Sequence, residues 1–276
     1  MANAITIDLE DWFCPSNIRE LAELDWDNFE IRVETPVLLL LDLLEEYNYK
    51  ATFFVLGFIA QKKPDLIREI NTRGHEIASH GYAHRMITKQ TQYEFEEDLK
   101  KSLDILEGIT SVKVKGYRAP VFTITNSTLW ALDILLKNGI EYDSSIYPFN
   151  LHPDYGIKNS QKRIYRHENG IIEVPLSVAS ILGLSIPCSG GAYFRFYPYH
   201  ISEYLLRKAH SQNGHTLFYI HPWEIDSGRP KIEMGIINKI RMNYNVSNTL
   251  NKLEKLFKKI EFTTIKDILS NGKYSY

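Results

Sequence analysis

The sequence predicts an α/β fold in one domain over residues 1–276, with parallel strands and crossover helices forming a closed or partly open β/α barrel. Short runs rich in β-branched and aromatic residues alternate with helical segments over the first 150 residues, the order typical of parallel sheets. The chain has 276 residues, of which 44% are hydrophobic, enough for one large core. No window reaches ~18 uncharged apolar residues, so no membrane span is predicted.

The elements follow in chain order. Strands are predicted over residues 4–9, 51–57, 75–80, 114–120, 140–146, 171–176 and 214–223. Helices are predicted between them over residues 34–49, 63–74, 93–108, 126–139 and 201–214. Pro36 is compatible with a first helical turn, and Gly74 and Gly139 each end a helix. Residues 150–170 are predicted as a long surface loop or hairpin, and a helix, a strand and a short helix over residues 245–270 complete the barrel.

Charge and cysteine content exclude some classes of protein. The formal net charge is −2, from 32 basic and 34 acidic residues, so no nucleic-acid partner is expected. Two cysteines, Cys14 and Cys188, cannot form a disulfide framework and are expected to be reduced. The N-terminus lacks a basic stretch followed by a long apolar run. A cytoplasmic location is therefore expected.

Chemically active groups follow five of the predicted strands. His80 and His84 are four residues apart, and on a helical turn both rings can bind one cation. An isolated pair of this kind is more often structural, but carboxylates at Glu10 and Asp11 follow the first strand. Because the carboxyl ends of parallel strands meet, two histidines and one carboxylate predict a catalytic zinc site with an open position for water.

The other strand ends offer groups that transfer protons. Asp8 can act as the base toward the water, and His221 can protonate the leaving group. Asp143 is expected to orient His221, and Arg118 to keep Asp8 ionised. A base, a metal site and a separate acid predict hydrolysis of an amide or ester.

These residues resemble the motifs of the polysaccharide deacetylases of carbohydrate esterase family 4, the NodB-homology group. The resemblance runs from Ile5 to about Asp226 and covers five ordered motifs. The resemblance implies a distorted (β/α)7 barrel, with His80 and His84 in the metal motif and "YDSS" at Asp143 in the aspartate motif. The family's remaining motifs fall on the sequences "RAP" and "FYIHPW", so the resemblance implies the same base, acid and pairings as the residues themselves. The backbone N–H of Val121, where the family commonly has tyrosine, would help to hold the oxyanion.

The first motif departs from the family pattern, because Leu9 stands where a second aspartate is usual. If the strand continues, Asp8 and Glu10 share a face, which favours Glu10 as the ligand. If the chain turns after Leu9, Asp11 is the shorter and more usual ligand. We prefer Asp11. The segments "IDLEDWF" and "HPWEID" resemble a branch of the family found with bacterial exopolysaccharide or O-antigen (lipopolysaccharide) loci.

Aromatic residues beside the motifs are candidates for binding a sugar ring: Trp12, Tyr147 and Trp223, with Phe122 as a further neighbour. The segment 189–199 is expected either to line a substrate groove or to form a turn and a packed strand. His75 is expected to be a structural hydrogen-bonding residue.

Taken together, these features predict a metal-dependent N-deacetylase that acts on an N-acetylated sugar in a glycan, or on a lipid- or nucleotide-linked precursor, and releases acetate. Zinc is the expected metal, with cobalt, nickel and iron as alternatives. A hydrolase of small cyclic amides or ureides on the same fold is the alternative enzyme. A catalytically inactive glycan-binding module is the alternative from another class. The sequence does not indicate the oligomeric state.

Overall fold

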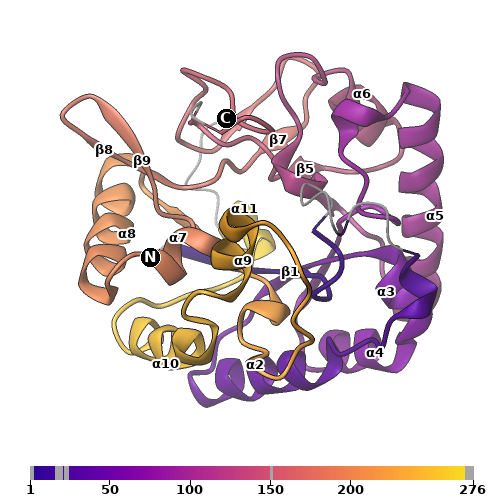
Figure 1. Cartoon of the computed structure of the whole chain (residues 1–276). Helices are drawn as coiled ribbons and strands as arrows, with labels where there is room; N and C mark the ends of the chain where they lie inside the picture. The colour runs from indigo at the N-terminus through magenta and orange to yellow at the C-terminus, as the bar shows by residue number, and fades with distance from the viewer. Residues whose placement is uncertain (1–2, 16–20, 22–24, 150–151, 271–276) are drawn as a thin grey trace.

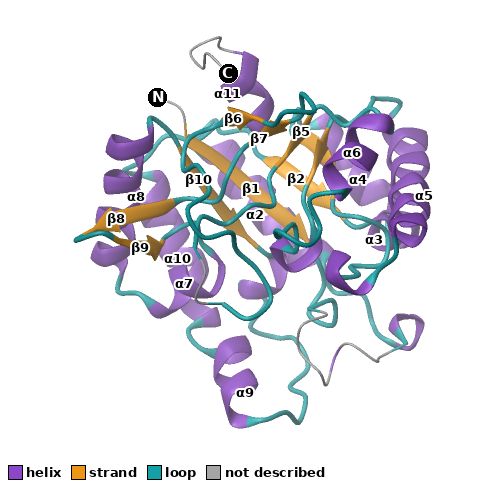
Figure 2. Cartoon of the chain, turned by 90° about the horizontal axis from the view of Figure 1, so that it is seen from above, coloured by secondary structure: helices purple, strands orange, loops and turns teal. Residues whose placement is uncertain are grey.

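One sheet of eight strands forms the centre of the computed structural model, which describes residues 3–15, 21, 25–149 and 152–270 (Figure 2). In spatial order the strands are β10 (Thr216–Ile220), β1 (Asn3–Leu9), β2 (Thr52–Val55), β3 (Glu76–Ser79), β4 (Gly116–Tyr117), β5 (Tyr142–Asp143), β7 (Ile172–Glu173) and β6 (Tyr165–Arg166). Every neighbouring pair is parallel except β6 and β7. Within the described residues β10 and β6 do not pair with each other, so the sheet curls into a half-barrel. The predicted parallel α/β fold is confirmed, and so are the seven strands predicted before residue 224.

Helices surround the sheet (Figure 1). They are α2 (Glu34–Glu46), α3 (Gly57–Lys62), α4 (Pro64–Thr72), α5 (Gln92–Thr110), α6 (Ala131–Lys137), α7 (Gly191–Phe196), α8 (Tyr199–Asn213), α9 (Ile236–Asn243), α10 (Val246–Phe257) and α11 (Ile265–Ser270). The longest, α5, begins with a capping box in which Thr91 and Glu94 each bond the other's backbone N–H. The five predicted helices are confirmed, although α6 begins at Ala131 rather than near residue 126.

Alternation along the strands divides the core into two layers. In β1, Ile5, Ile7 and Leu9 belong to the cluster between the sheet and the surrounding helices, whereas Ala4 belongs to a second cluster inside the half-barrel. Since side chains alternate between the two faces of a strand, Asp8 points to the same inner side as Ala4. This periodicity places a carboxylate inside the barrel at the carboxyl end of β1.

The structure after residue 150 differs from the sequence prediction at four places, one of which is the helix α9, where no element was predicted. The strand expected within 245–270 is reduced to one parallel bridge, between Thr263 and Ala4. Segment 189–199 forms the helices α7 and the start of α8 rather than a packed strand. A two-stranded hairpin that was not predicted, β8 (Val178–Ile181) with β9 (Leu184–Pro187), precedes α7. The hairpin expected within 150–170 is present in part, because β6 pairs antiparallel with β7.

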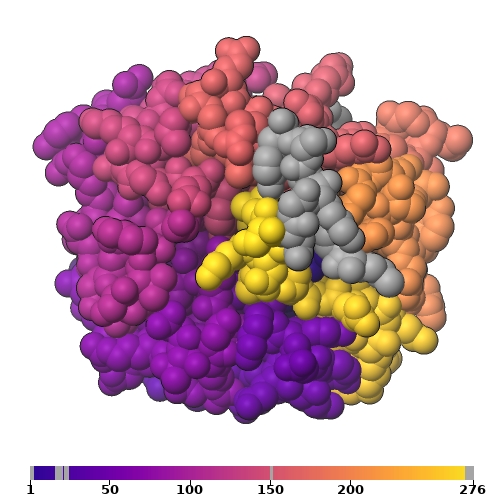
Figure 3. All heavy atoms as spheres, turned by 180° about the vertical axis from the view of Figure 1, so that it is seen from behind, coloured from indigo at the N-terminus to yellow at the C-terminus, as the bar shows by residue number. Residues whose placement is uncertain are grey.

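The amino ends of the strands are closed by the last described helix. The N–H of Ile265 donates to Thr52 Oγ1 at 2.8 Å, and the N–H of Lys266 donates to Glu76 Oε2 at 3.0 Å. Figure 3 shows this C-terminal segment in yellow against the N-terminal third of the chain. With this end covered, the opposite end of the half-barrel is where a substrate can enter.

Gly190 fixes α7 against β10. Its φ of 126° lies in the region that favours glycine, and a Cβ there would lie 1.9 Å from the carbonyl oxygen of Tyr219. We expect Gly190→Ala to lower the free energy of unfolding by more than about 3 kcal/mol in chemical denaturation. Gly108→Ala within α5, where the new methyl group meets nothing within 4 Å, is the control and should raise it by up to about 1 kcal/mol. Equal effects of the two changes would contradict this assignment.

Candidate active site

Asp8 and Arg118 form a buried ion pair at the carboxyl ends of β1 and β4. Arg118 Nη1 lies 2.5 Å from Asp8 Oδ1 and 2.8 Å from Thr6 Oγ1. The guanidinium also donates from Nε to the carbonyl of Ser144 at 3.0 Å and lies 4.0 Å from the centre of the Phe54 ring. Because every side of Arg118 is held, it places a fixed positive charge beside one oxygen of Asp8 and leaves the other oxygen toward the cavity. The predicted pairing of Asp8 with Arg118 is present.

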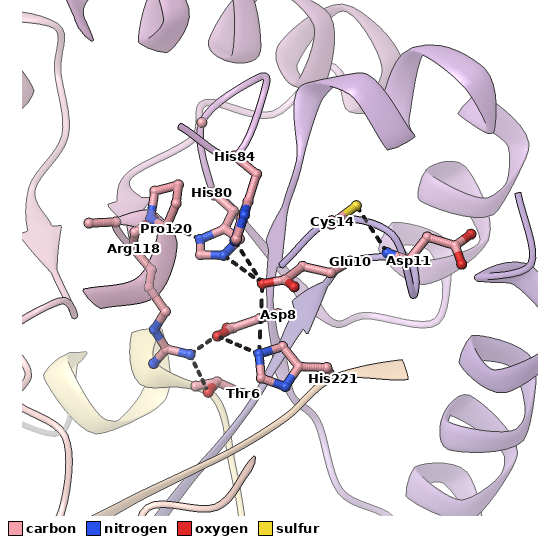
Figure 4. Close-up of polar contacts among 12 residues, drawn as sticks. Thr6, Asp8, Glu10, Asp11, Cys14, His80, His84, Arg118, Pro120 and His221 are labelled. Carbon is pink, nitrogen blue, oxygen red and sulfur yellow. Dashed lines mark hydrogen bonds and ion pairs between the residues drawn. The ribbon is translucent and has the colours of Figure 1, made fainter. Parts of the chain in front are cut away.

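Glu10, His80 and His84 converge on one point beside Asp8 (Figure 4). Glu10 Oε1 lies 3.2 Å from His80 Nε2 and 3.0 Å from His84 Nε2. All three side chains are buried. Burial by itself would raise the pKa of Glu10, but His84, His221 and His80 hold that pKa well below its usual range.

The ring nitrogens of His80 and His84 lie where they could ligate a cation together with Glu10. His80 Nδ1 lies 2.8 Å from the carbonyl oxygen of Arg118, which only accepts hydrogen bonds, so Nδ1 must donate. In a neutral ring Nε2 then carries a lone pair, and that lone pair faces a carboxylate oxygen. His84 Nδ1 is buried without a hydrogen-bond partner among the described residues, its Nε2 faces Glu10 Oε1 at 3.0 Å, and its φ is 50°. Two imidazole nitrogens and a carboxylate are the donors that zinc and related divalent metals take.

Asp11 does not belong to this cluster, which corrects our preference for it over Glu10. Its Oδ1 accepts from the N–H of Trp12 at 2.8 Å, and its Oδ2 accepts from the N–H groups of Arg32 at 2.6 Å and Val33 at 2.9 Å. The chain does turn after β1, since the N–H of Glu10 donates to the carbonyl of Asp8. The longer side chain of Glu10 nevertheless reaches the histidines, while the Asp11 carboxylate is occupied by the backbone that enters α2. Figure 4 shows the two side chains pointing in opposite directions.

His221 is held by Glu224, a residue that the sequence prediction missed. His221 Nδ1 lies 2.9 Å from Glu224 Oε2, and Glu224 Oε1 accepts from Arg195 Nε at 2.7 Å. Nε2 of the same ring lies 3.9 Å from Asp8 Oδ2, facing the site. Burial lowers the pKa of His221, but the charges of Glu10, Glu224 and Asp8 raise it to about 9. The ring is therefore protonated near neutral pH, as a general acid must be.

Asp143 does not contact His221, so its predicted role as the orienting residue is wrong. Its carboxylate instead accepts from the hydroxyl of Ser145 at 2.6 Å and from the N–H of Ser145 at 3.1 Å. The reason is topological: β5 and β10 are separated by four strands in an open sheet. The signal for Glu224 was in the sequence, because a glutamate three residues after His221 is the spacing of a capping box.

Asp143 instead pairs with Glu173, and this pair should make stability depend on pH. Burial raises the pKa of Asp143 well above its usual range, and burial raises the pKa of Glu173 to about 7. A carboxyl group whose pKa is higher in the folded state than in the unfolded state stabilises the protein when the pH is below the unfolded-state pKa. This contribution to stability is lost as the pH rises through the folded-state pKa. We expect the contribution of this pair to the free energy of unfolding to fall by on the order of 2 kcal/mol between pH 4.5 and pH 7.5. Urea denaturation measures this contribution as the difference between the wild type and Glu173→Gln at each pH, and a difference that does not change with pH would contradict the assignment.

A cavity of about 440 Å³ is lined by Asp8, Glu10, His80, His84 and His221. The cavity is also lined by Val121, whose φ is 55°, and by Trp223. The Trp223 ring stacks on His221 with ring centres 5.1 Å apart. Phe122 is also part of the wall. Trp12 and Tyr147 are not among the described residues that line the cavity, so the prediction that they bind sugar is not supported. Trp12 packs edge-on against Phe13 and Phe29, and Tyr147 is fully buried.

The far wall of the cavity is contributed by segment 189–199 and by α9. The α7 residues that line this wall are Ala192, Tyr193, Arg195 and Phe196. The segment therefore borders the cavity. Tyr155 and His152 stack on each other at the same wall, with ring centres 3.9 Å apart. Asp8, Glu10 and His221 thus lie at one end of this cavity, and the outer part of the cavity is largely aromatic and aliphatic.

Two family models match adjoining parts of the chain. Residues 27–142 match a polysaccharide deacetylase model, and residues 144–270 match a domain of unknown function, DUF3473. Both regions contribute strands to the one sheet, because β2 and β3 come from the first and β7 and β10 from the second. The single-domain organisation remains a prediction that this shared sheet supports. No helix in the described part of the chain has the length and apolarity needed to cross a membrane.

Individual proteins are also similar. A peptidoglycan-N-acetylglucosamine deacetylase of Bacillus cereus is 35% identical over 120 residues, which is 43% of this chain and 42% of that protein. The chain spans about two-fifths of the length of the curated relatives it matches. A Mycobacterium smegmatis structure assigned as a polysaccharide deacetylase has a TM-score of 0.61 at 20% identity, covering 98% of this chain and 89% of its own. PuuE allantoinase has a TM-score of 0.62 at 15% identity, covering 100% and 91%. These two structural likenesses show the fold.

Proposed function

We propose, from the premise that this chain belongs to the polysaccharide deacetylases of carbohydrate esterase family 4, that it is a metal-dependent enzyme that removes an N-acetyl group from an amino sugar. The substrate would be a bacterial glycan or glycan precursor, and the products acetate and a free amine. One observation carries the proposal: a metal-ligand cluster, a base paired with arginine and an acid paired with glutamate meet in one cavity.

The metal would be held by Glu10, His80 and His84. Two imidazoles and one carboxylate are a ligand set typical of zinc. When bound, a divalent metal polarises the amide carbonyl and makes water easier to deprotonate. His80 is positioned for this by its Nδ1–H bond to the Arg118 carbonyl, which fixes the tautomer that leaves Nε2 available.

The protons are moved by the chain's own side chains. Asp8 would take a proton from the attacking water, with its second oxygen held by Arg118. His221 would give its Nε2 proton to the departing nitrogen, so that an amine rather than an amide anion leaves. Glu224 keeps His221 Nδ1 hydrogen-bonded and supplies the negative charge that favours the imidazolium. The N–H of Val121 is proposed to donate to the oxyanion from the cavity wall.

The direct test is acetate release from N-acetylglucosamine oligosaccharides, with the free amine measured on the same samples. The wild-type protein should release the two products in equal amounts, and Asp8→Asn should release neither above background. Turnover of a cyclic ureide such as allantoin without acetate release from any N-acetylated sugar would instead support the alternative amide hydrolase. Glycan binding that survives in Asp8→Asn and His221→Ala, with no turnover in the wild type, would support a binding module. A cytoplasmic location remains a prediction, which cell fractionation tests.

A further inference from the structure

An exposed apolar surface borders the cavity on the side away from the strands. It consists of five residues, which we name the apolar rim: Phe196, Ile236, Ile237, Ile240 and Tyr244. Ile236 and Ile237 are 75% and 78% exposed, and Ile240 is 50% exposed. Four of the five come from α9 or the residue that follows it, and Figure 2 shows α9 standing away from the sheet. Single exposed aliphatic residues are common, but a contiguous group at the mouth of a cavity indicates a binding surface.

The orientation of α9 is fixed by buried arginines. Arg195 donates to the carbonyl oxygens of Arg241 at 2.7 Å and Tyr244 at 2.9 Å, and Arg229 donates to that of Met242. The rings of Phe196 and Tyr244 stack with centres 4.8 Å apart. Since its C-terminal end is held in this way and Met242 already fills the inner side, α9 cannot turn its isoleucines inward. The apolar rim is therefore a fixed surface.

The rim is continuous with the cavity that holds the catalytic groups. Phe196, Ile237 and Ile240 line the same cavity as Asp8, Glu10 and His221. Among the described residues that line this cavity, Phe196, Ile237 and Ile240 are the exposed ones, so they mark its opening to solvent. A part of the substrate that leaves the cavity at this opening lies on the apolar rim.

We infer that the apolar rim binds a long aliphatic chain attached to the amino sugar, so that the substrate is a glycolipid rather than a free polysaccharide. The side chains of Ile237 and Ile240 offer no hydrogen bonds to the hydroxyl groups of a polar sugar extension, which would lose contact with water where it lies against them. An alkyl or prenyl chain gains from burial against the same side chains. This inference rests on the proposed function, because it assumes that the sugar is bound at the catalytic end of the cavity.

The experiment compares methyl and octyl N-acetyl-β-D-glucosaminide, the octyl glycoside being kept below its critical micelle concentration. For the wild type we expect the KM of acetate release to be at least about tenfold lower for the octyl glycoside. In the double variant Ile237→Ser/Ile240→Ser this ratio should fall to within about threefold. The control Leu182→Ser/Leu184→Ser changes side chains that are 98% and 66% exposed on the β8–β9 hairpin, away from α9 in Figures 1 and 2, and should keep the full ratio.

Three outcomes would overturn the inference. One is an equal KM for the two glycosides in the wild type. Another is an octyl preference that survives in the isoleucine double variant. The third is a shift from dimer to monomer in that variant with no change in the ratio, which would assign the rim to a second copy of the chain. If neither glycoside releases acetate, the proposed function fails. The inference is then tested by the dissociation constants of both glycosides, measured by calorimetry on the same proteins and compared in the same way as the KM values.

Discussion

Replacing Glu10 with alanine is expected to abolish metal binding, whereas replacing Asp11 with asparagine is expected to leave it intact. Among the described residues, Glu10 alone has a carboxylate oxygen within 3.2 Å of the nitrogens of His80 and His84. Metal content after dialysis should therefore fall from about one ion per chain to near zero in Glu10→Ala, as in His80→Ala and His84→Ala. Acetate release should fall with it, by at least about a thousandfold, because the carbonyl is no longer polarised.

Asp11→Asn is the matched control for Glu10→Ala. It weakens an acceptor of three backbone N–H groups, so the free energy of unfolding should fall by about 1–3 kcal/mol in denaturant titration. The folded variant should still hold one metal ion. Loss of metal from Asp11→Asn in its folded state, with retention in Glu10→Ala, would return the ligand role to Asp11.

Replacing Glu224 with glutamine is expected to lower kcat for amide hydrolysis by about 10²–10³-fold, whereas Asp143→Asn should lower it by less than about tenfold. The Glu224 carboxylate is buried, and although burial alone would raise its pKa, Arg195 and His221 lower that pKa to about 2. It is therefore anionic near neutral pH. Glutamine keeps the shape but removes the charge that favours the protonated His221.

Two readouts separate this effect from a loss of folding. An aryl acetate, whose phenolate leaves without a proton, should be hydrolysed by Glu224→Gln with less than about a tenfold loss. The basic limb of the pH–rate profile should also move to lower pH, because the pKa of His221 is held at about 9 partly by Glu224. Equal losses on the amide and on the aryl ester would show that Glu224 is only structural.

The strands and the identity of most site residues were predictable because they depend on local patterns. Short runs rich in β-branched and aromatic residues located the seven parallel strands before residue 224, and the carboxyl ends of those strands supplied Asp8, His80, His84 and His221. The regular helices followed from capping and glycine signals such as Gly74 and Gly139.

The remaining parts depend on distances that the sequence does not contain. The choice between Glu10 and Asp11 depends on which of two adjacent carboxylates the backbone near Val33 takes up. The prediction for Asp143 was wrong because four strands separate β5 from β10, and no local sequence pattern records that separation. The helix α7 was missed because glycines and aromatic residues do not favour helix, and tertiary packing on β10 decides its conformation.

The most direct test of metal-dependent deacetylation at this site is to remove metal with a chelator and then titrate zinc back while acetate release is measured. We predict no acetate release without metal, and a linear rise that ends at one equivalent of zinc per chain. The same titration of Glu10→Ala should stay flat. Acetate release that continues undiminished in the metal-free wild type would contradict the role assigned to Glu10, His80 and His84.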